Sequence, residues 1–282
     1  MFNYEYACVW QAGGVQDGGQ TDIVKRSWDE WSDSWYVGYR TEEVISRVIK
    51  QPASAFHPTT FSMIMKAFPD LRGKRICVPS SGDNHAVFAF HLMGAHVTSC
   101  DISERQLENS SVIAQRYGWD IEFICDDTMK LSSIKSNDYD FVYTSNGVHV
   151  WIHDLNSMYT QIHRVLKPNG AFIMYDIHPF MRPFGTSSTD KIHVVNPYDS
   201  TGPFGEIPTY KWRIQDMLNA MMSSGFTVKH MEEMFAVDGR FWVDESKGEA
   251  SRLSDQDLED FRNWQFNPLA ALPQWLSIYA TK

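Results

Sequence analysis

The most constraining feature of this chain is a strand, a turn of small residues, a helix and a second strand between residues 75 and 101. Residues 75–79 form an apolar run typical of a buried strand, and residues 84–93 follow as a helix that ends at Gly94. Residues 96–100 form the second strand, with Asp101 at its tip. Strands joined through a helix pair in parallel by a right-handed crossover, so this segment predicts a parallel sheet.

The same alternation continues along the chain. Further strands are predicted at residues 121–125, 139–144, 171–176, 227–232 and 274–280, and further helices at residues 104–117, 153–166 and 214–224. Ser103 is expected to cap the helix 104–117, and Gly118 to end it. The predicted fold class is α/β: a Rossmann-like, doubly wound sheet of seven mostly parallel strands with helices on both faces.

The segments that interrupt the alternation of strands and helices define the predicted domain organisation. Residues 1–70 are expected to form an N-terminal arm, which is glycine-rich up to residue 20, and a helical lid. Residues 71–282 form the main domain, with long insertions at 179–209 and 238–272. The lid carries an aromatic stripe at helical spacing: Trp28, Trp31, Trp35 and Tyr39. We interpret the stripe first as core packing and second as a cover over a bound cofactor, and the two are compatible.

Composition narrows the classes of function. The chain has 282 residues, of which 43% are hydrophobic, and a formal net charge of -10. A packed globular protein is expected, and the acidic charge disfavours nucleic acid as a partner. Cys77, Cys100 and Cys125 fall in or beside strands and are interpreted as apolar core residues, so no metal site is expected. No signal peptide or membrane span is recognised, which predicts a cytoplasmic protein without a membrane partner.

The turn after the first strand and the acid after the second form a candidate nucleoside site. Ser80, Ser81 and Gly82 are small, so a ligand can approach the backbone at the start of a helix. Asp101 lies 19 residues after Gly82 (101 − 82 = 19), the distance that brings it back beside the turn. Its carboxylate can accept hydrogen bonds from two ribose hydroxyls. The alternative role is a cap for the next helix, which Ser103 can supply itself.

Motifs in order over roughly 200 residues make the chain resemble the class I S-adenosylmethionine-dependent methyltransferases, of the small-molecule type. The matching segments are residues 76–84 (the first motif), 100–103, 125–127, 138–143, 164–170 and 217–226. The resemblance implies S-adenosylmethionine as cofactor, S-adenosylhomocysteine as product and an antiparallel last strand. A dinucleotide is disfavoured, because residues 80–85 do not supply the glycine pattern of the dehydrogenases.

The resemblance also implies which residues hold the cofactor. They are Pro79, Ser80, Ser81, Gly82, Asp83, Asp101, Ile102, Gln106, Asp126, Asp127 and Asn146. Asp101 would bind the ribose, Asp126 and Asp127 the adenine amino group, and Asn146 the methionine end through its backbone. The first motif is a variant: Val78 stands in the place of the usual acid, and Ser80 and Asn84 stand at glycine places. Trp151 is expected either to stack on adenine or to fill the core.

The expected chemistry is methyl transfer to an oxygen, nitrogen or carbon atom of a small molecule, which needs alignment and, for some acceptors, a base. His178 is the first candidate base and His149 the second, ahead of His153, although a structural role is the more common one for any single histidine. Asp176 and Tyr175 are candidates for positioning the acceptor.

The two insertions leave the nature of the acceptor open. Their aromatic residues favour an apolar acceptor or a small core of their own, whereas Arg182, Lys211 and Arg213 could bind an acidic one. A non-catalytic protein that binds the cofactor or a nucleoside is the alternative function. The oligomeric state is not predicted.

Overall fold

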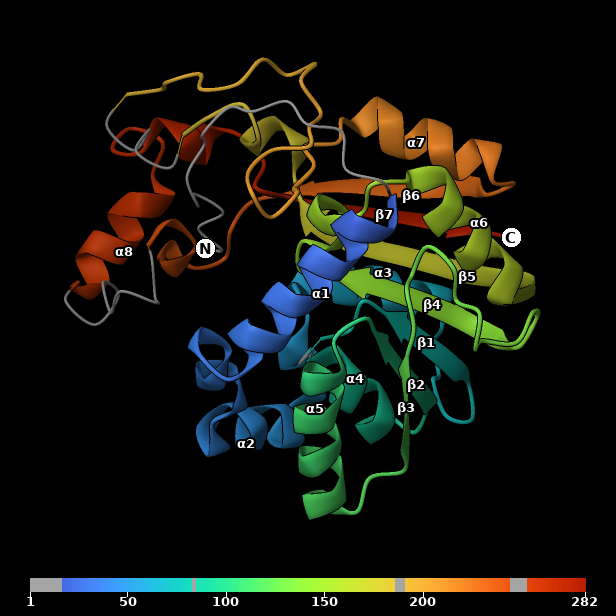
Figure 1. Cartoon of the computed structure of the whole chain (residues 1–282). Coiled ribbons are helices and arrows are strands. Elements are labelled where there is room, and N and C mark those ends of the chain that lie inside the picture. Colours follow the sequence, from blue (N-terminus) through green and yellow to red (C-terminus); the bar gives the residue numbers. More distant parts are fainter. Residues whose placement is uncertain (1–16, 83–84, 186–190, 244–252) are drawn as a thin grey trace.

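The computed structural model describes residues 17–82, 85–185, 191–243 and 253–282, and its centre is one seven-stranded sheet (Figure 1). The strand order is β3-β2-β1-β4-β5-β7-β6. The strands are β1 (Arg75–Pro79), β2 (His96–Asp101), β3 (Ile121–Cys125), β4 (Tyr139–Ser145), β5 (Leu166–Ile177), β6 (Thr227–Met234) and β7 (Trp275–Thr281). Strands β1 to β5 pair in parallel, and β7 is antiparallel to β5 and β6. The predicted fold class is confirmed, including the antiparallel last strand.

Alternate side chains of each strand supply the two cores on either side of the sheet. In β4, Val142 packs with helices α6 (Leu155–Val165) and α7 (Ile214–Ser223). Its neighbours Phe141 and Tyr143 pack on the other face, with α2 (Glu42–Lys50), α3 (Pro58–Ala67) and α4 (His85–Leu92). Because both faces are covered, the central strands β1 and β4 are buried along almost their whole length, whereas the edge strands β3 and β6 carry exposed polar residues.

Most predicted boundaries hold to within two residues, and three expectations about local structure are wrong. Helix α1 (Asp17–Ser32) begins inside the stretch expected to be an arm up to residue 20. Strand β5 begins at Leu166 rather than 171, because Leu166 already pairs with Tyr139 before a register shift. Cys125 is exposed, although Cys77 and Cys100 are buried as expected.

The insertions contain little regular structure among their described residues. The first holds the short helix η4 (Pro179–Met181), and the second holds η5 (Gly239–Trp242), α8 (Asp255–Arg262) and η8 (Pro268–Ala271). Met181 from the first packs with Trp242 and Leu269 from the second. The aromatic residues Phe184, Phe241 and Trp242 therefore serve a small shared core, one of the two roles that the sequence leaves open. No helix among the described residues has the length and apolar character that crossing a bilayer requires.

Candidate functional site

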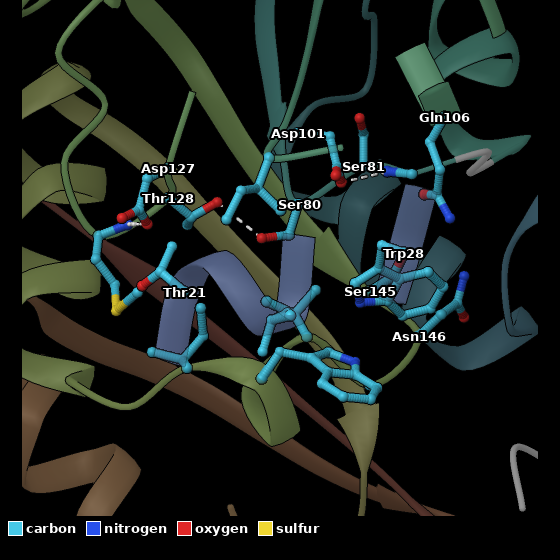
Figure 2. A pocket seen from close by; sticks show the side chains of 18 of the residues that line it. Thr21, Trp28, Ser80, Ser81, Asp101, Gln106, Asp127, Thr128, Ser145 and Asn146 are labelled. Atoms are coloured by element: carbon cyan, nitrogen blue, oxygen red, sulfur yellow. Dashed lines mark hydrogen bonds between the residues drawn. The ribbon is translucent and has the colours of Figure 1, made fainter. Parts of the chain in front are cut away.

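A pocket with an empty volume of about 750 Å³, its open mouth included, lies at the carboxyl ends of the parallel strands (Figure 2). Its walls come from helix α1, from the short helices η1 (Trp35–Arg40) and η3 (Val148–Trp151), and from the segments after β1, β2, β3 and β4. The lining residues are Thr21, Val24, Trp28, Tyr36, Ser80, Ser81, Gly82, Asp101, Ile102, Gln106, Asp127, Thr128, Met129, Ser145, Asn146, Gly147, Val148, Trp151 and Ile152.

The strand order explains why the pocket forms at this place. Strands β1 and β4 are neighbours, and the chain leaves them in opposite directions along the sheet, which opens a crevice at their carboxyl ends. Both segments that border the crevice have unusual backbone: Ser80 has φ +49° and Asn146 has φ +67°. Non-glycine residues with positive φ cost free energy and concentrate at functional sites, and both of these residues line the pocket.

The turn after β1 requires glycine at its centre. Gly82 has φ +49°, and a Cβ atom built on it would lie 2.2 Å from Oε1 of Gln106. The positive φ at residue 82 is what favours glycine, and the missing side chain leaves room for Gln106 beside the turn. Ser81 and Ser80 tie the turn to its neighbours, since their hydroxyls lie 2.7 Å from those of Ser99 and Thr128 respectively.

Asp101 joins the two sides of this turn. Its Oδ2 accepts from the backbone N–H of Gly82 at 2.8 Å, and its Oδ1 accepts from the N–H of Ser103 at 2.8 Å. The side chain of Ser103 caps helix α5 (Glu104–Tyr117), as predicted, so Asp101 is not needed as the cap. Burial raises the pKa of Asp101 to about 6, even though its backbone hydrogen bonds act to lower it.

The other predicted cofactor residues divide into those that reach the pocket and those that do not. Ser80, Ser81, Gly82, Asp101, Ile102, Gln106, Asp127 and Asn146 line it. Asp126 does not: its carboxylate accepts from the N–H groups of Asp127 and Ser133, which fixes the turn after β3. Pro79 is not among the lining residues either, and Asp83 lies outside the described residues. The backbone N–H of Asn146 already donates to the carbonyl of Tyr175 at 3.0 Å, so it cannot bind a ligand as well.

The aromatic stripe of the N-terminal region forms one wall of the pocket. Trp28 lines it together with Tyr36 and Trp151, while Trp31 packs against both Trp28 and Trp151 at ring-centroid distances of 5.2 and 5.7 Å. Tyr39 packs on Tyr36 at 4.9 Å. Of the stripe residues, Trp28 lines the pocket, and Trp31 and Tyr39 pack behind its lining rings, whereas the side chain of Trp35 lies outside the described part of the structure.

Polar contacts hold helix α1 over the pocket at both of its ends. Near its end, Asp29 accepts from the Ser103 hydroxyl at 2.7 Å, which fixes α1 beside the start of α5 (Figure 1). Near its beginning, Gln20 accepts from the Tyr210 hydroxyl at 2.6 Å. Helix α1 therefore spans the pocket from the β2 side to the segment before α7.

His149 does not line the pocket and belongs to a buried polar network. Its Nδ1 is 2.6 Å from Oδ2 of Asp176, and its Nε2 is 2.7 Å from the Tyr159 hydroxyl. Burial raises the pKa of Tyr159 well above its usual value, so the phenol donates to Nε2 while Nδ1–H donates to the carboxylate. Burial acts to raise the pKa of Asp176, but the imidazole and the Arg182 guanidinium lower it overall. Both ring nitrogens of His149 are hydrogen-bonded, and the backbone N–H of His149 also donates to Oδ2 of Asp176 at 3.1 Å.

His178 and His153 are also absent from the pocket lining. The Nδ1 atom of His178 accepts from the N–H of Phe180 at 3.1 Å, and its Nε2 is 2.8 Å from Glu233. Burial lowers the pKa of this imidazole. The three candidate bases are therefore not brought together, and His178 fixes the end of β5 to β6. No cluster of three or more potential metal-binding side chains occurs among the residues that the structure describes.

Sequence reasoning missed most of the pocket wall that α1 supplies. Thr21 and Val24 join Trp28 at spacings of three and four residues, so a helical pattern was present, but it does not tell which face meets a ligand. Thr128, Ser145 and Gly147, which are direct sequence neighbours of predicted residues, and Met129 beside Thr128 were missed as well.

Known proteins resemble this chain in sequence over part of its length. Residues 79–174 match the methyltransferase domain family. The chain is 27% identical over 176 residues to a sterol 24-C-methyltransferase of Gibberella zeae, which covers 57% of this chain and 43% of that protein. It is 41% identical over 76 residues to a mitochondrial arginine-hydroxylase of Danio rerio, which covers 26% and 21% respectively. The chain thus spans less than half the length of these curated relatives.

Solved structures share the fold over most of the chain. An S-adenosylmethionine-dependent methyltransferase from Mesorhizobium loti aligns with a TM-score of 0.57 at 20% identity, covering 79% of this chain and 97% of that one. The magnesium protoporphyrin IX methyltransferase of Synechocystis PCC 6803, solved with bound S-adenosylhomocysteine, aligns with a TM-score of 0.58 at 15% identity, covering 93% and 99%. Residues 79–174 thus match a methyltransferase domain, and the chain shares the fold of the S-adenosylmethionine-dependent methyltransferases.

Proposed function

We propose that this protein transfers a methyl group from S-adenosylmethionine to a small-molecule acceptor. The observation that carries the proposal is the pocket at the β1/β4 crevice, which gathers Asp101, Gly82 and Gln106 with the segments after β3 and β4. The sterol and porphyrin methyltransferases that resemble the chain are named for small acceptors, which supports the same substrate class.

The residues of the pocket fit a nucleoside. Asp101 uses two of its four lone-pair positions on backbone N–H groups, which leaves two for ribose hydroxyls. Gln106 places its Nε2 against the pocket, buried and without a hydrogen-bond partner among the described residues. A buried amide donor without an acceptor is costly, and a ligand oxygen or ring nitrogen would satisfy it.

We assign the two ends of the pocket to the two ends of the cofactor. Figure 2 shows Asp127 and Thr128 toward one end and Trp28, Ser145 and Asn146 toward the other. The Asp127 carboxylate accepts from the N–H of Met129 and pairs with Lys130 at 3.3 Å, and the lone pairs left on its oxygens can accept from an adenine amino group. The segment around Asn146 would meet the methionine part.

The bound cofactor would supply an electrophilic methyl group on a sulfonium, and the chain's own residues align and enclose it. Helix α1 shields the pocket from water, and the anchored segment Val148–Trp151 sets the wall beside Asn146. We give His149 a positioning role, because Asp176 and Tyr159 occupy both of its ring nitrogens. We assign no proton transfer to His178, because it does not line the pocket in the structure.

Calorimetry and product analysis test the proposal in sequence. Titration with S-adenosylmethionine and with S-adenosylhomocysteine is expected to show binding to one site, which Asp101→Ala abolishes. Mass spectrometry of reactions with small-molecule pools is then expected to show S-adenosylhomocysteine formed together with a product heavier by one methylene. Absence of binding would reject the proposal.

The second candidate function is cofactor binding without catalysis. It is favoured by the absence of all three histidines from the pocket lining and by Val78 in the place of the usual acid. Binding of both nucleosides without turnover on any acceptor would support it, and turnover on one acceptor would exclude it. A cytoplasmic location and an N-terminal lid over residues 71–282 stay proposals alongside either function.

A further inference from the structure

Three aromatic rings form a corner at the Asn146 end of the pocket. Trp28 from α1 stands at 79° to Tyr36 from η1, with ring centroids 5.9 Å apart. It stands at 77° to Trp151 from η3, with centroids 5.4 Å apart. All three side chains line the pocket. Rings that are nearly perpendicular wall a corner, whereas parallel rings would form a flat stack.

The corner is built by elements that are far apart in the sequence and is supported from behind. Trp31 packs against Trp28 and Trp151, and Tyr39 packs against Tyr36. Neither of these supporting rings is among the pocket-lining residues. The positions of the three lining rings are therefore fixed by further rings, which reduces the entropy lost when a ligand binds between them.

The charge around the corner favours a cation. No lysine or arginine is among the described residues that line the pocket. Of its two acids, Asp127 lies toward the other end and pairs with Lys130 at 3.3 Å, so Asp101 is the acid that contributes negative charge here. Aromatic faces attract cations through the ring quadrupole, and the attraction grows when water is excluded. A neutral apolar group would gain contact area in this corner but none of this electrostatic attraction.

We propose that Trp28, Tyr36 and Trp151 form a subsite for a methylated onium cation. Two sources offer that chemistry: the sulfonium of the cofactor, which rests on the proposed function, and a methylated ammonium group on the acceptor. In the first case the subsite distinguishes the charged cofactor from its neutral product and so favours exchange after each turnover. In the second it selects acceptors that carry a positive charge.

Paired ligands that differ in charge test the subsite. The first pair is S-adenosylmethionine and S-adenosylhomocysteine. The second pair, titrated with S-adenosylhomocysteine bound, is choline and its uncharged carbon isostere 3,3-dimethylbutan-1-ol. Each ligand is titrated by calorimetry into the wild type, Trp28→Leu and Trp151→Leu. Trp28→Phe and Trp151→Phe keep an aromatic ring, and Trp119→Leu is the matched control at a ring that packs on Tyr117 away from the pocket lining.

The expected result is a loss of charge selectivity only where the ring is removed. Each leucine variant should lose about tenfold in affinity for the charged member of a pair and less than about twofold for the neutral member, whereas the phenylalanine variants keep most of the difference. Loss of charge selectivity within the first pair identifies the sulfonium as the ligand, and loss of charge selectivity within the second pair identifies an ammonium acceptor.

If the leucine variants bound both members of each pair more weakly by the same factor, the cation subsite would be refuted, and the three rings would be only an apolar wall of the pocket. A wild-type protein that binds neither nucleoside would instead reject the proposed function. The choline pair, titrated without nucleoside, would then decide on the subsite alone.

Discussion

Asp101 should make nucleoside binding depend on pH below neutrality. Its side chain is buried, with the residue 6% exposed, and burial raises its pKa from 3.8 to about 6 in the ligand-free protein. One pKa unit corresponds to about 1.4 kcal/mol, so keeping this carboxylate ionised at neutral pH costs about 3 kcal/mol. A ligand whose hydroxyl groups donate to the ionised carboxylate would recover part of that free energy.

The sign of the effect follows from which state holds the proton more tightly. Because the pKa of Asp101 is higher in the folded than in the unfolded chain, the ligand-free protein loses stability as pH rises from about 4 to about 6, and its stability is level above that range. Ribose hydroxyls that lower this pKa make binding release a proton. Affinity should therefore rise with pH up to about 6, and it should be roughly tenfold weaker at pH 5 than at pH 7 if the pKa returns to its usual value.

Calorimetry with 5′-methylthioadenosine measures this dependence, because that ligand has a ribose but no amino-acid group that titrates between pH 5 and pH 7. Titrations in two buffers of different ionisation enthalpy report the released proton directly. Asp101→Asn should abolish the pH dependence, and Asp127→Asn, which alters the other acid in the pocket, should retain it. An affinity that is equal at both pH values, or a slope that survives in Asp101→Asn, would refute the reasoning.

Three further outcomes are expected. Gly82→Ala should weaken S-adenosylhomocysteine binding by about 1–3 kcal/mol, because the backbone is strained and the new methyl group meets Gln106. Adding Gln106→Ala should restore part of the affinity in calorimetry, and no recovery would contradict the contact. Asp176→Ala should lower the free energy of unfolding in urea by about 3–5 kcal/mol, because it leaves His149 buried without its partner, and a loss below 1 kcal/mol would contradict the network. Asp29→Ala should speed hydrogen exchange in α1 but not in β4, and unchanged exchange in α1 would show that this contact does not hold the helix.

The sheet was predictable because its signals are local. Residues 75–79 and 121–125 combine apolar and β-branched residues, and both strands have the predicted bounds. Helix α5 was also predicted to the residue, because Ser103 caps it and Gly118 ends it at φ +68°. The turns that line the pocket could be predicted in the same way, because each one comes directly after a predicted strand.

The features that the sequence did not predict depend on contacts between distant parts of the chain. Gly18 and Gly19 disfavour a helix, yet α1 begins at Asp17, and the contact between Gln20 and Tyr210, 190 residues apart, holds its first turn. Likewise, no spacing shows that both ring nitrogens of His149 are already bonded. The sequence identifies a histidine as a possible base, but only tertiary structure shows whether a nitrogen is available.

The contribution of α1 to the pocket has a consequence for how such proteins diverge. The part that matches the methyltransferase domain family begins at residue 79, whereas Thr21, Val24, Trp28 and Tyr36 precede it. Two proteins can therefore share the whole matching domain and still present different chambers to their acceptors. On the proposed function, exchanging residues 17–40 between relatives would then transfer acceptor preference without changing the nucleoside half of the site.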